Sequence, residues 1–253
     1  MEARREGVVG VAAIMQHRSE GSLRREICDA GRTLYDRGLI GPLDGNISAR
    51  VGDRYLVCTP SGSHKGELRP DDLVKLTLDG RLVTQGAKPS SEILMHLEIY
   101  AARPDVACVV HAHPPCAVGL TVAGVSLDKP VVPEILFAIG EVPNVPYSSP
   151  TTRDVPDAIR AVLSRCDAFM LARHGSVTLC EDPRRGVIMT ETIEHTAKIT
   201  LAARAAGGAS PLPDAEVSKL LGLARAMRGG PANDEAAVIE AVTKAVLAKL
   251  KKP

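Results

Sequence analysis

The residues best suited to chemistry are two histidines in an apolar, β-branched segment, Val109-Val110-His111-Ala112-His113-Pro114. Alternate side chains of an extended strand share a face at a rise of roughly 3.3 Å per residue, so we expect His111 and His113 to point the same way, roughly 6.6 Å apart at Cα. Two imidazoles at that spacing can bind one ion at roughly 2.0–2.1 Å. The alternative is a pair of strand histidines that hydrogen-bond to their neighbours.

A third histidine favours the metal interpretation. His174 follows the apolar residues Leu171 and Ala172, at a point where a turn is expected. Three histidines that leave one position open are typical of catalytic metal sites, whereas structural zinc sites are closed, commonly by cysteine. The six cysteines contain no CxxC pair, and none is placed to close such a site. The sequence therefore predicts an open, catalytic metal site.

The triplet Ser90-Ser91-Glu92 is the second candidate element, at the start of an expected helix. Capping of that helix would by itself explain two serines and an early glutamate. The functional alternative is anion binding by the helix N-terminus, with Glu92 directed at the reacting carbon. His96 lies one helical turn after Glu92 and is expected to be a structural hydrogen-bonding residue.

Two glycine-containing turns could add neutral hydrogen-bond donors to the same site. They are Gly45-Asn46-Ile47-Ser48 and Thr59-Pro60-Ser61-Gly62. Asn, Ser and Thr supply the donors, and glycine permits the unusual backbone angles of a tight turn. Each motif alone is explained more simply as a turn, and neither is a P-loop.

Alternating helices and strands must position these residues. Leu23, Ile27, Ala30 and Leu34 recur at helical spacing after Ser22, the expected N-cap. The further elements expected are strands at 46–51, 55–59 and 73–78, a helix at 90–102, a strand at 106–113, one or two strands within 131–145, a helix at 152–165, strands at 168–172 and 176–180, and a helix at 184–206. This mixture of hairpins and helices predicts one layered α/β domain rather than a repeating βαβ array.

The chain divides into three expected regions. Residues 1–21 form a loose leader, 22–208 the catalytic domain, and 209–253 a C-terminal helical extension with the basic tail Lys249-Leu250-Lys251-Lys252. The apolar run from Gly7 to Met15 is short, acidic residues flank it, and no small-residue cleavage site follows, so export is not expected. The dispersed cysteines are typical of a cytoplasmic protein, and no apolar run reaches the length of a membrane span.

Composition excludes several classes of function. The 31 Lys and Arg residues against 30 Asp and Glu leave a formal charge of +1, which argues against a nucleic-acid-binding protein. With no Trp, two Phe and four Tyr, there is little material for base stacking. A hydrophobic content of 45% argues against disorder. A small polar substrate, bound by charges, backbone amides or a metal, fits best.

The motifs are more specific in their order than singly. The ordered set is Gly45-Asn46-Ile47-Ser48, Thr59-Pro60-Ser61-Gly62, Pro89-Ser90-Ser91-Glu92 with His96, His111-x-His113, Pro146-Tyr147 and Arg173-His174-Gly175. Over about residues 22–208 this set resembles the class II aldolase/adducin-head family, which includes L-fuculose-1-phosphate aldolase and L-ribulose-5-phosphate 4-epimerase. The resemblance implies an α/β protein, a three-layer α/β/α sandwich around a largely antiparallel sheet. It also implies a homotetramer with active sites between subunits.

The resemblance implies roles for individual residues. His111, His113 and His174 match the metal ligands, with Zn²⁺ the usual ion and Mn²⁺ or Co²⁺ as alternatives, and Glu92 matches the general acid or base. The positions that match the phosphate pocket are Asn46, Ser61, Gly62, Ser90 and Ser91. Leu43 stands where the fuculose enzyme has a phosphate-contacting threonine, and Glu134 lies near the position of its tyrosine proton donor. Glu134 and Tyr147 are therefore candidates for acid–base or specificity roles.

The activity expected from the resemblance is that of a metal-dependent aldolase, a carbon–carbon lyase. It would cleave a ketose 1-phosphate to dihydroxyacetone phosphate and an aldehyde through a metal-stabilised enediolate. A decarboxylase, dehydratase or epimerase that acts through a related enediolate is the alternative, because Glu134 replaces the tyrosine. A non-catalytic adducin-like scaffold is a second alternative, which the retained histidines and Glu92 argue against. The expected partner is a small phosphorylated sugar, without nucleic acid or membrane.

Overall fold

A seven-stranded mixed sheet forms the centre of the molecule. The computed structural model describes residues 18–229, so most of the expected leader and the basic tail lie outside the described residues. The strand order is β3-β2-β1-β4-β7-β6-β5, and all neighbouring strands are antiparallel except β5 and β6. The strands are β1 (Asn46–Val51), β2 (Tyr55–Cys58), β3 (Val74–Thr77), β4 (Cys108–Ala112), β5 (Asn144–Val145), β6 (Ala168–Leu171) and β7 (Gly175–Cys180).

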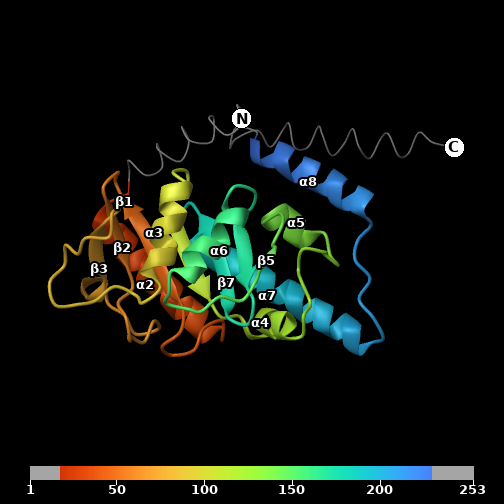
Figure 1. Cartoon of the computed structure of the whole chain (residues 1–253), viewed down its shortest axis with the longest axis horizontal. Helices are drawn as coiled ribbons and strands as arrows, with labels where there is room; N and C mark the ends of the chain where they lie inside the picture. Colours follow the sequence, from red (N-terminus) through yellow and green to blue (C-terminus); the bar gives the residue numbers. More distant parts are fainter. Residues whose placement is uncertain (1–17, 230–253) are drawn as a thin grey trace.

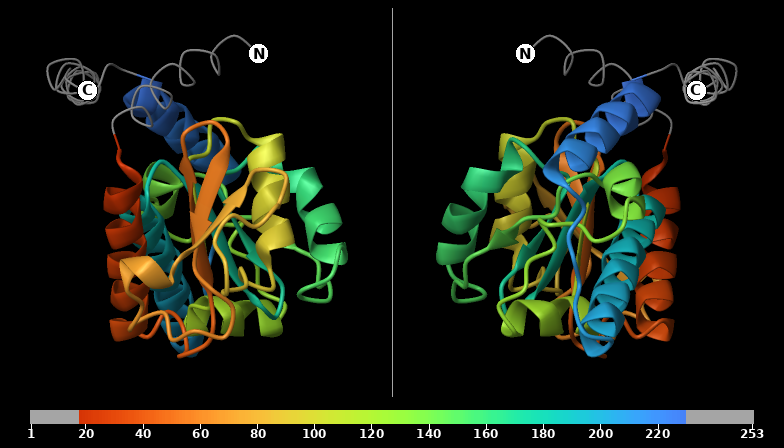
Figure 2. Two further views of the ribbon diagram at one scale, coloured as in Figure 1. Left: turned by 90° about the vertical axis from the view of Figure 1, so that its left-hand side faces the viewer. Right: turned by 90° about the vertical axis from the view of Figure 1, so that its right-hand side faces the viewer.

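Helices cover both faces of this sheet. The helices are α2 (Glu20–Asp36), η1 (Pro70–Asp72), α3 (Ile93–Ala102), α4 (Pro115–Val122), α5 (Glu134–Ala138), α6 (Asp154–Leu163), α7 (Pro183–Ala205) and α8 (Asp214–Gly229). Helices α2 and α7 lie against one face, and α3 and α6 against the other (Figures 1 and 2). Each face has its own hydrophobic core. The three-layer α/β/α sandwich around a largely antiparallel sheet is confirmed.

The start of α2 differs from the expectation. Ser19, rather than Ser22, is the N-cap, because the Ser19 Oγ accepts the backbone N–H of Ser22 at 3.2 Å. The Ser22 hydroxyl instead donates to Glu26 at 3.0 Å. Both serines satisfy the composition rule for a helix start, and only the backbone angles decide between them. The predicted apolar stripe, which includes Ile27 and Leu34, is buried.

The segment 131–145 contains a helix where only strands were expected. Helix α5 follows Pro133, and β5 is limited to two residues that pair in parallel with β6. Ile135, Leu136 and Ile139 are all buried, and a strand could not bury the adjacent Ile135 and Leu136 on one face. Helix α4 was also not expected, although a proline at its first position is compatible with a helix start.

The described part of the C-terminal extension packs against the domain. The Leu212 N–H donates to the Pro130 carbonyl at 2.9 Å, and Val217, Leu220 and Leu221 contact the core on the α2 and α7 face. Helix α8 therefore lies next to α5, as Figure 1 shows. Among residues 18–229, none of the helices combines the length and apolar character needed to cross a bilayer.

Candidate metal centre

The pleat of β4 selects the face on which its histidines lie. Val110 belongs to the core beneath α2 and α7, whereas Val109 belongs to the core beneath α3 and α6. Because side chains alternate along a strand, His111 and the following His113 share the face of Val109. The helix that carries Glu92 at its N-terminus, α3, packs on this same face. The predicted alternation therefore brings the two histidines towards the predicted carboxylate.

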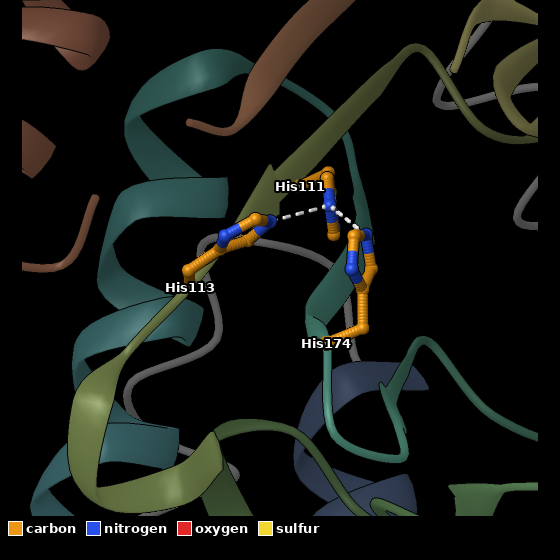
Figure 3. A group of neighbouring side chains, drawn as sticks. All are labelled: His111, His113 and His174. Carbon is orange, nitrogen blue, oxygen red and sulfur yellow. Dashed lines mark hydrogen bonds between the residues drawn. The ribbon is translucent and has the colours of Figure 1, made fainter. Parts of the chain in front are cut away.

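His174 joins the two histidines from a tight turn between β6 and β7. Its backbone N–H donates to the Leu171 carbonyl at 3.1 Å, and its ring points at those of His111 and His113 (Figure 3). The Nε2 atom of His111 lies 2.9 Å from that of His113 and 3.1 Å from that of His174. Three residues that are up to 63 positions apart thus present ligand atoms within 4.8 Å of one another.

Gly175 makes this approach of the rings sterically feasible. A Cβ atom at this position would lie 2.7 Å from His113 Cδ2 and 2.8 Å from His111 Cε1. It would also lie 2.5 Å from the Ala112 carbonyl oxygen, which is part of the β4 backbone and cannot move without disturbing the sheet. The absence of a side chain at Gly175 therefore leaves the room that the histidine rings occupy.

The hydrogen bonds around the cluster suit a metal ion. The Nδ1 atom of His111 is 2.9 Å from the Ser176 carbonyl, which can only accept, so Nδ1 carries the proton and the Nε2 lone pair faces the cluster. Ligand nitrogens around one tetrahedral ion at roughly 2.0–2.1 Å lie roughly 3.3–3.4 Å apart, slightly more than the spacing observed here. The donor set and its geometry therefore fit a divalent cation such as zinc.

Glu92 is the carboxylate nearest to the histidines. Its Oε1 lies 2.9 Å from His174 Nε2 and its Oε2 lies 3.3 Å from His111 Nε2. Burial by itself raises the pKa of Glu92, but the charges and hydrogen bonds of His111 and His174 outweigh it and leave this pKa well below its usual range. Glu92 is therefore ionised at neutral pH and can accept a proton beside the cluster. It does not cap α3 with its side chain.

The comparison with protein families identifies this arrangement. The model of the class II aldolase and adducin N-terminal domain matches residues 25–201, which include all three histidines and Glu92. This chain belongs to the class II aldolase and adducin family. The family resemblance expected from the ordered motifs is thus confirmed. Class II aldolases are metal-dependent enzymes, in agreement with the three-histidine cluster.

Relatives within the class II aldolase family carry more than one activity. The chain is 34% identical over 185 residues to a 3-oxo-tetronate 4-phosphate decarboxylase of Pectobacterium atrosepticum, covering 72% of this chain and 84% of that protein. It is 33% identical over 201 residues to a 5-deoxy-D-ribulose 1-phosphate aldolase of Bacillus thuringiensis, covering 78% and 92%. The solved structure of Escherichia coli YgbL has a TM-score of 0.74 at 30% identity and covers 80% of this chain and 99% of that one.

The residues matched to the class II aldolase phosphate pocket come from neighbouring loops. The Ser61 N–H donates to the Lys88 carbonyl at 3.0 Å, and Pro60 forms a bridge with Pro89, so the Ser61-Gly62 and Ser90-Ser91 loops are adjacent. Ser90 is buried, and its Oγ accepts the Glu92 N–H at 3.3 Å. Glu92 is the N-cap residue of α3 and no side chain caps this helix, so Ser90 only stabilises the turn that precedes it. The role of these residues in phosphate binding stays a prediction.

Glu134 and Tyr147 lie apart from the histidines in the described part of this chain. Glu134 is the exposed first residue of α5, and Tyr147 is 62% exposed in the loop after β5. Within residues 18–229, no hydrogen bond or ion pair joins either side chain to the three-histidine cluster. The site of a single chain is therefore built without them.

Lys65 is a residue near the site that sequence reasoning missed. Its side chain is buried, and its Nζ donates to the carbonyls of Leu43 and Ser63, each at 2.9 Å. The ammonium group thus ties the loop before β1 to the loop after β2. Burial lowers the pKa of Lys65, and the charges of Asp44 and Glu92 oppose this effect. A lysine in a polar loop carries no sequence signal for burial, so only the structure identifies it.

Proposed function

We propose that this protein is a metal-dependent lyase that breaks the bond between the α and β carbons of the keto group in a small phosphorylated substrate. Decarboxylation of a 3-oxo-4-phospho sugar acid is the reaction that we favour. The observation that carries the proposal is the position of one ionised carboxylate, Glu92, against three converging imidazoles. Aldol cleavage of a ketose 1-phosphate, expected from the sequence, is the second candidate.

In this proposal His111, His113 and His174 hold the ion, with Zn²⁺ first and Mn²⁺ or Co²⁺ as alternatives. When bound, the ion supplies a Lewis acid for the keto oxygen and the neighbouring hydroxyl oxygen of the substrate. The hydroxyl and backbone groups of Ser61, Gly62, Ser90 and Ser91 bind the phosphate, together with Asn46. The homotetramer and the cytoplasmic location expected from the sequence belong to the same proposal.

Glu92 has the proton-transfer role in the proposed reaction. Loss of CO₂ breaks the bond between C1 and C2, and the electron pair stays with C2 in conjugation with the C3 carbonyl. C2 must then gain one proton, so the net reaction takes up one proton from solvent and releases CO₂. Glu92 is the carboxylate that lies against the cluster, so it is the group proposed to collect this proton and deliver it to C2. From 3-oxo-tetronate 4-phosphate the product would be dihydroxyacetone phosphate.

Two observations support decarboxylation over aldol cleavage. First, CO₂ leaves without a proton, whereas aldol cleavage also requires a group that takes the proton of the hydroxyl on the departing aldehyde. Within residues 18–229 of one chain, Glu92 is the one carboxylate hydrogen-bonded to the cluster. Asp44 approaches only the outer ring nitrogen of His113, Nδ1, at 3.8 Å, and Glu134 and Tyr147 are not joined to the cluster. Second, the decarboxylase of Pectobacterium atrosepticum is a relative at 34% identity. The Bacillus thuringiensis aldolase, at 33% identity, keeps aldol cleavage as the second candidate.

The test is a direct comparison of substrates with the same metal-loaded protein. We expect 3-oxo-tetronate 4-phosphate to yield CO₂ and dihydroxyacetone phosphate in equal amounts, faster than any of a panel of ketose 1-phosphates yields an aldehyde. Release of an aldehyde without CO₂ would instead favour aldol cleavage. A protein that binds one metal ion per chain but turns over none of these substrates would overturn both lyase proposals. A protein that binds neither metal nor substrate would favour the non-catalytic scaffold.

A further inference from the structure

We propose that His96 is a positioning residue that acts on Glu92 through the side-chain amide of Asn46. This inference rests on the proposed function, because the role of Glu92 as the proton-transfer group belongs to that proposal. His96 does not touch the substrate site in this arrangement. It fixes which end of the Asn46 amide faces Glu92, and so fixes the direction in which the Glu92 carboxylate is held.

A continuous line of hydrogen bonds leads from the metal centre into the core. Asn46 Nδ2 donates to Glu92 Oε2 at 2.8 Å, and Asn46 Oδ1 lies 2.5 Å from His96 Nε2. On the other side of the imidazole, His96 Nδ1 lies 2.7 Å from Ser48 Oγ. Tyr100 Oη is 2.9 Å from the same Ser48 oxygen and donates to the Ser48 carbonyl, also at 2.9 Å. All of these side chains except Glu92 are less than 5% exposed.

The chemistry of the groups assigns one direction to every bond in this line. The NH₂ end of the Asn46 amide donates to the Glu92 carboxylate, so the other end of this amide, its oxygen, can only accept. The amide oxygen then faces His96, whose Nε2 must carry the proton. His96 Nδ1 is left with a lone pair and accepts from the Ser48 hydroxyl. Because Ser48 Oγ has then given its only proton, the single Tyr100 hydroxyl proton is shared between Ser48 Oγ and the Ser48 carbonyl.

The state of His96 agrees with this assignment. Burial, helped by the charge of His111 and opposed by that of Glu92, lowers the pKa of His96 to about 3. A neutral imidazole has one donor and one acceptor, which is what the line of bonds requires at this place. His96 is therefore neutral near pH 7, where it donates from one ring nitrogen and accepts at the other.

Register in the sheet explains why these residues meet. Asn46, the first residue of β1, pairs with His111 of β4, so its side chain begins beside a histidine of the cluster. Ser48, two residues later, faces the same side as Asn46. Helix α3 places Glu92, His96 and Tyr100 at intervals of four residues, along one face of the helix. Asn46 therefore reaches both Glu92 and His96, and Ser48 reaches both His96 and Tyr100.

The kinetic test compares a variant that loses the Nε2 donor with one that keeps a donor. His96→Leu removes the donor to Asn46 Oδ1, and we expect kcat to fall about 10- to 100-fold, with KM and metal content nearly unchanged. His96→Gln offers an amide N–H close to the position of the imidazole Nε2, and we expect it to recover most of this loss. Asn46→Asp sets a second carboxylate against Glu92 and should lower kcat at least as strongly as His96→Leu.

Tyr100→Phe is the matched control. It removes a buried hydroxyl and its two contacts with Ser48, but leaves the bonds that join Glu92, Asn46, His96 and Ser48 to one another. We expect kcat within about threefold of the wild type, even if its melting temperature falls as far as that of His96→Leu. Equal losses of kcat in Tyr100→Phe and His96→Leu, or no rescue by His96→Gln, would show that the cluster acts only through stability and would overturn the proposal.

A spectroscopic measurement separates this inference from the proposed function. Long-range ¹H–¹⁵N NMR of the imidazoles reports which ring nitrogen carries the proton, with or without turnover. We expect His96 to hold its proton on Nε2 in both the metal-free and the zinc-loaded protein. A proton on Nδ1, or on both nitrogens at neutral pH, would overturn the positioning role. If the wild type turns over none of the substrates tested, the proposed function fails, and the tautomer of His96 still decides this inference.

Discussion

Among the three candidate ligands, His113 offers the cleanest test of the metal centre. His111 is fully buried, whereas the His113 side chain is 23% exposed and lies just beyond the end of β4. The backbone N–H of His113 donates to the Leu39 carbonyl at 2.9 Å, a bond that does not depend on the side chain. Removal of its imidazole therefore removes a ligand without removing a packing residue.

We expect His113→Ala to lose stoichiometric metal while keeping its fold. Two imidazoles and a carboxylate remain, but the loss of one of three neutral nitrogen ligands should weaken binding by orders of magnitude. Metal analysis after dialysis, with circular dichroism for the fold, measures both expectations. His195→Ala, at an exposed position of α7, is the matched control. A His113→Ala protein that retains one equivalent of zinc would contradict the ligand assignment.

Glu92 is tested by a change that preserves its shape. Glu92→Gln keeps an oxygen that can accept from Asn46 but cannot carry a proton to C2. We expect zinc content near that of the wild type and a loss of kcat of about 10²- to 10⁴-fold, the usual range for a general acid or base. Steady-state rates of CO₂ release give kcat, and metal analysis gives the zinc content. Near-normal turnover in this variant would show that another group transfers the proton.

At the scale of elements, the carboxylate of Glu194 fixes the helix that follows the His113 loop. Glu194 is buried in α7, and its Oε2 accepts the backbone N–H groups of Cys116 at 3.0 Å and Ala117 at 3.1 Å. These N–H groups lie in the first turn of α4, where a helix has no internal acceptors for them. A side chain from one helix thus caps another across the core.

We expect Glu194→Ala to destabilise the fold by about 2–3 kcal/mol, because hydrogen bonds to a charged acceptor are lost and buried N–H groups are left unpaired. Denaturant unfolding measures this value. Glu194→Gln retains one acceptor oxygen and should lose about half as much. Glu191→Ala, on the same helix, is the control. It removes only a part-exposed ion pair with Arg37 and should cost at most about 1 kcal/mol. Equal stabilities of Glu194→Ala and the wild type would contradict the capping role.

Helix α2 is joined to the edge strand β3 by Glu20. Its carboxylate accepts from Lys75 Nζ at 2.7 Å and from Arg24 Nε at 2.9 Å. Burial raises the pKa of Glu20, but these two hydrogen bonds and the accompanying charges outweigh it and lower the pKa below its ordinary value. A carboxyl group with a lowered pKa in the folded state stabilises the fold above its unfolded pKa and loses that effect as the pH falls through the folded value.

We therefore expect Glu20→Gln to be less stable than the wild type by roughly 0.5–1 kcal/mol at pH 7. The difference should shrink as the pH falls from about 4.5, where the carboxyl of the unfolded chain becomes protonated, through the lower pKa of the folded protein. Urea unfolding of both proteins at a series of pH values measures the difference. A gap that persists unchanged at pH 3 would show that Glu20 acts through packing rather than through its charge.

Elements set by a local residue pattern could be predicted from the sequence, and those set by distant packing partners could not. The β1 bounds and the period-two pattern of β4 are local, so the strands and the shared face of His111 and His113 were predicted correctly. In 131–145 the apolar residues satisfy both a strand and a helix period, and the choice of α5 depends on packing partners that only the fold supplies. The burial of Asn46 depends on cross-strand register, and that of Lys65 depends on two carbonyls from separate loops, so neither could be read locally.

At the scale of the whole molecule, the metal centre joins parts of the chain that are distant in sequence and that the fold brings together. His111 and His113 come from the end of β4, and His174 comes from the turn between β6 and β7. Strand β7 pairs with both β4 and β6, so these ligands already lie in one continuous sheet. We infer that the cluster is largely formed before an ion binds, and that the fold does not require the ion in the way a zinc finger does.

This leads to a quantitative expectation for metal removal. An ion that binds only the folded state, at a free concentration 100 times its dissociation constant, stabilises that state by about 2.7 kcal/mol. For a domain of this size each kcal/mol shifts the melting temperature by roughly 2–4 °C, so we expect chelation to lower it by roughly 5–11 °C. Far-ultraviolet circular dichroism at 25 °C should change little, because the sheet and both helical layers persist. Differential scanning calorimetry with and without chelator measures the shift, and His113→Ala, which lacks the site, should show none. Loss of secondary structure on chelation would mean that the ion holds the fold together, and an equal shift in His113→Ala would mean that the chelator acts elsewhere in the molecule.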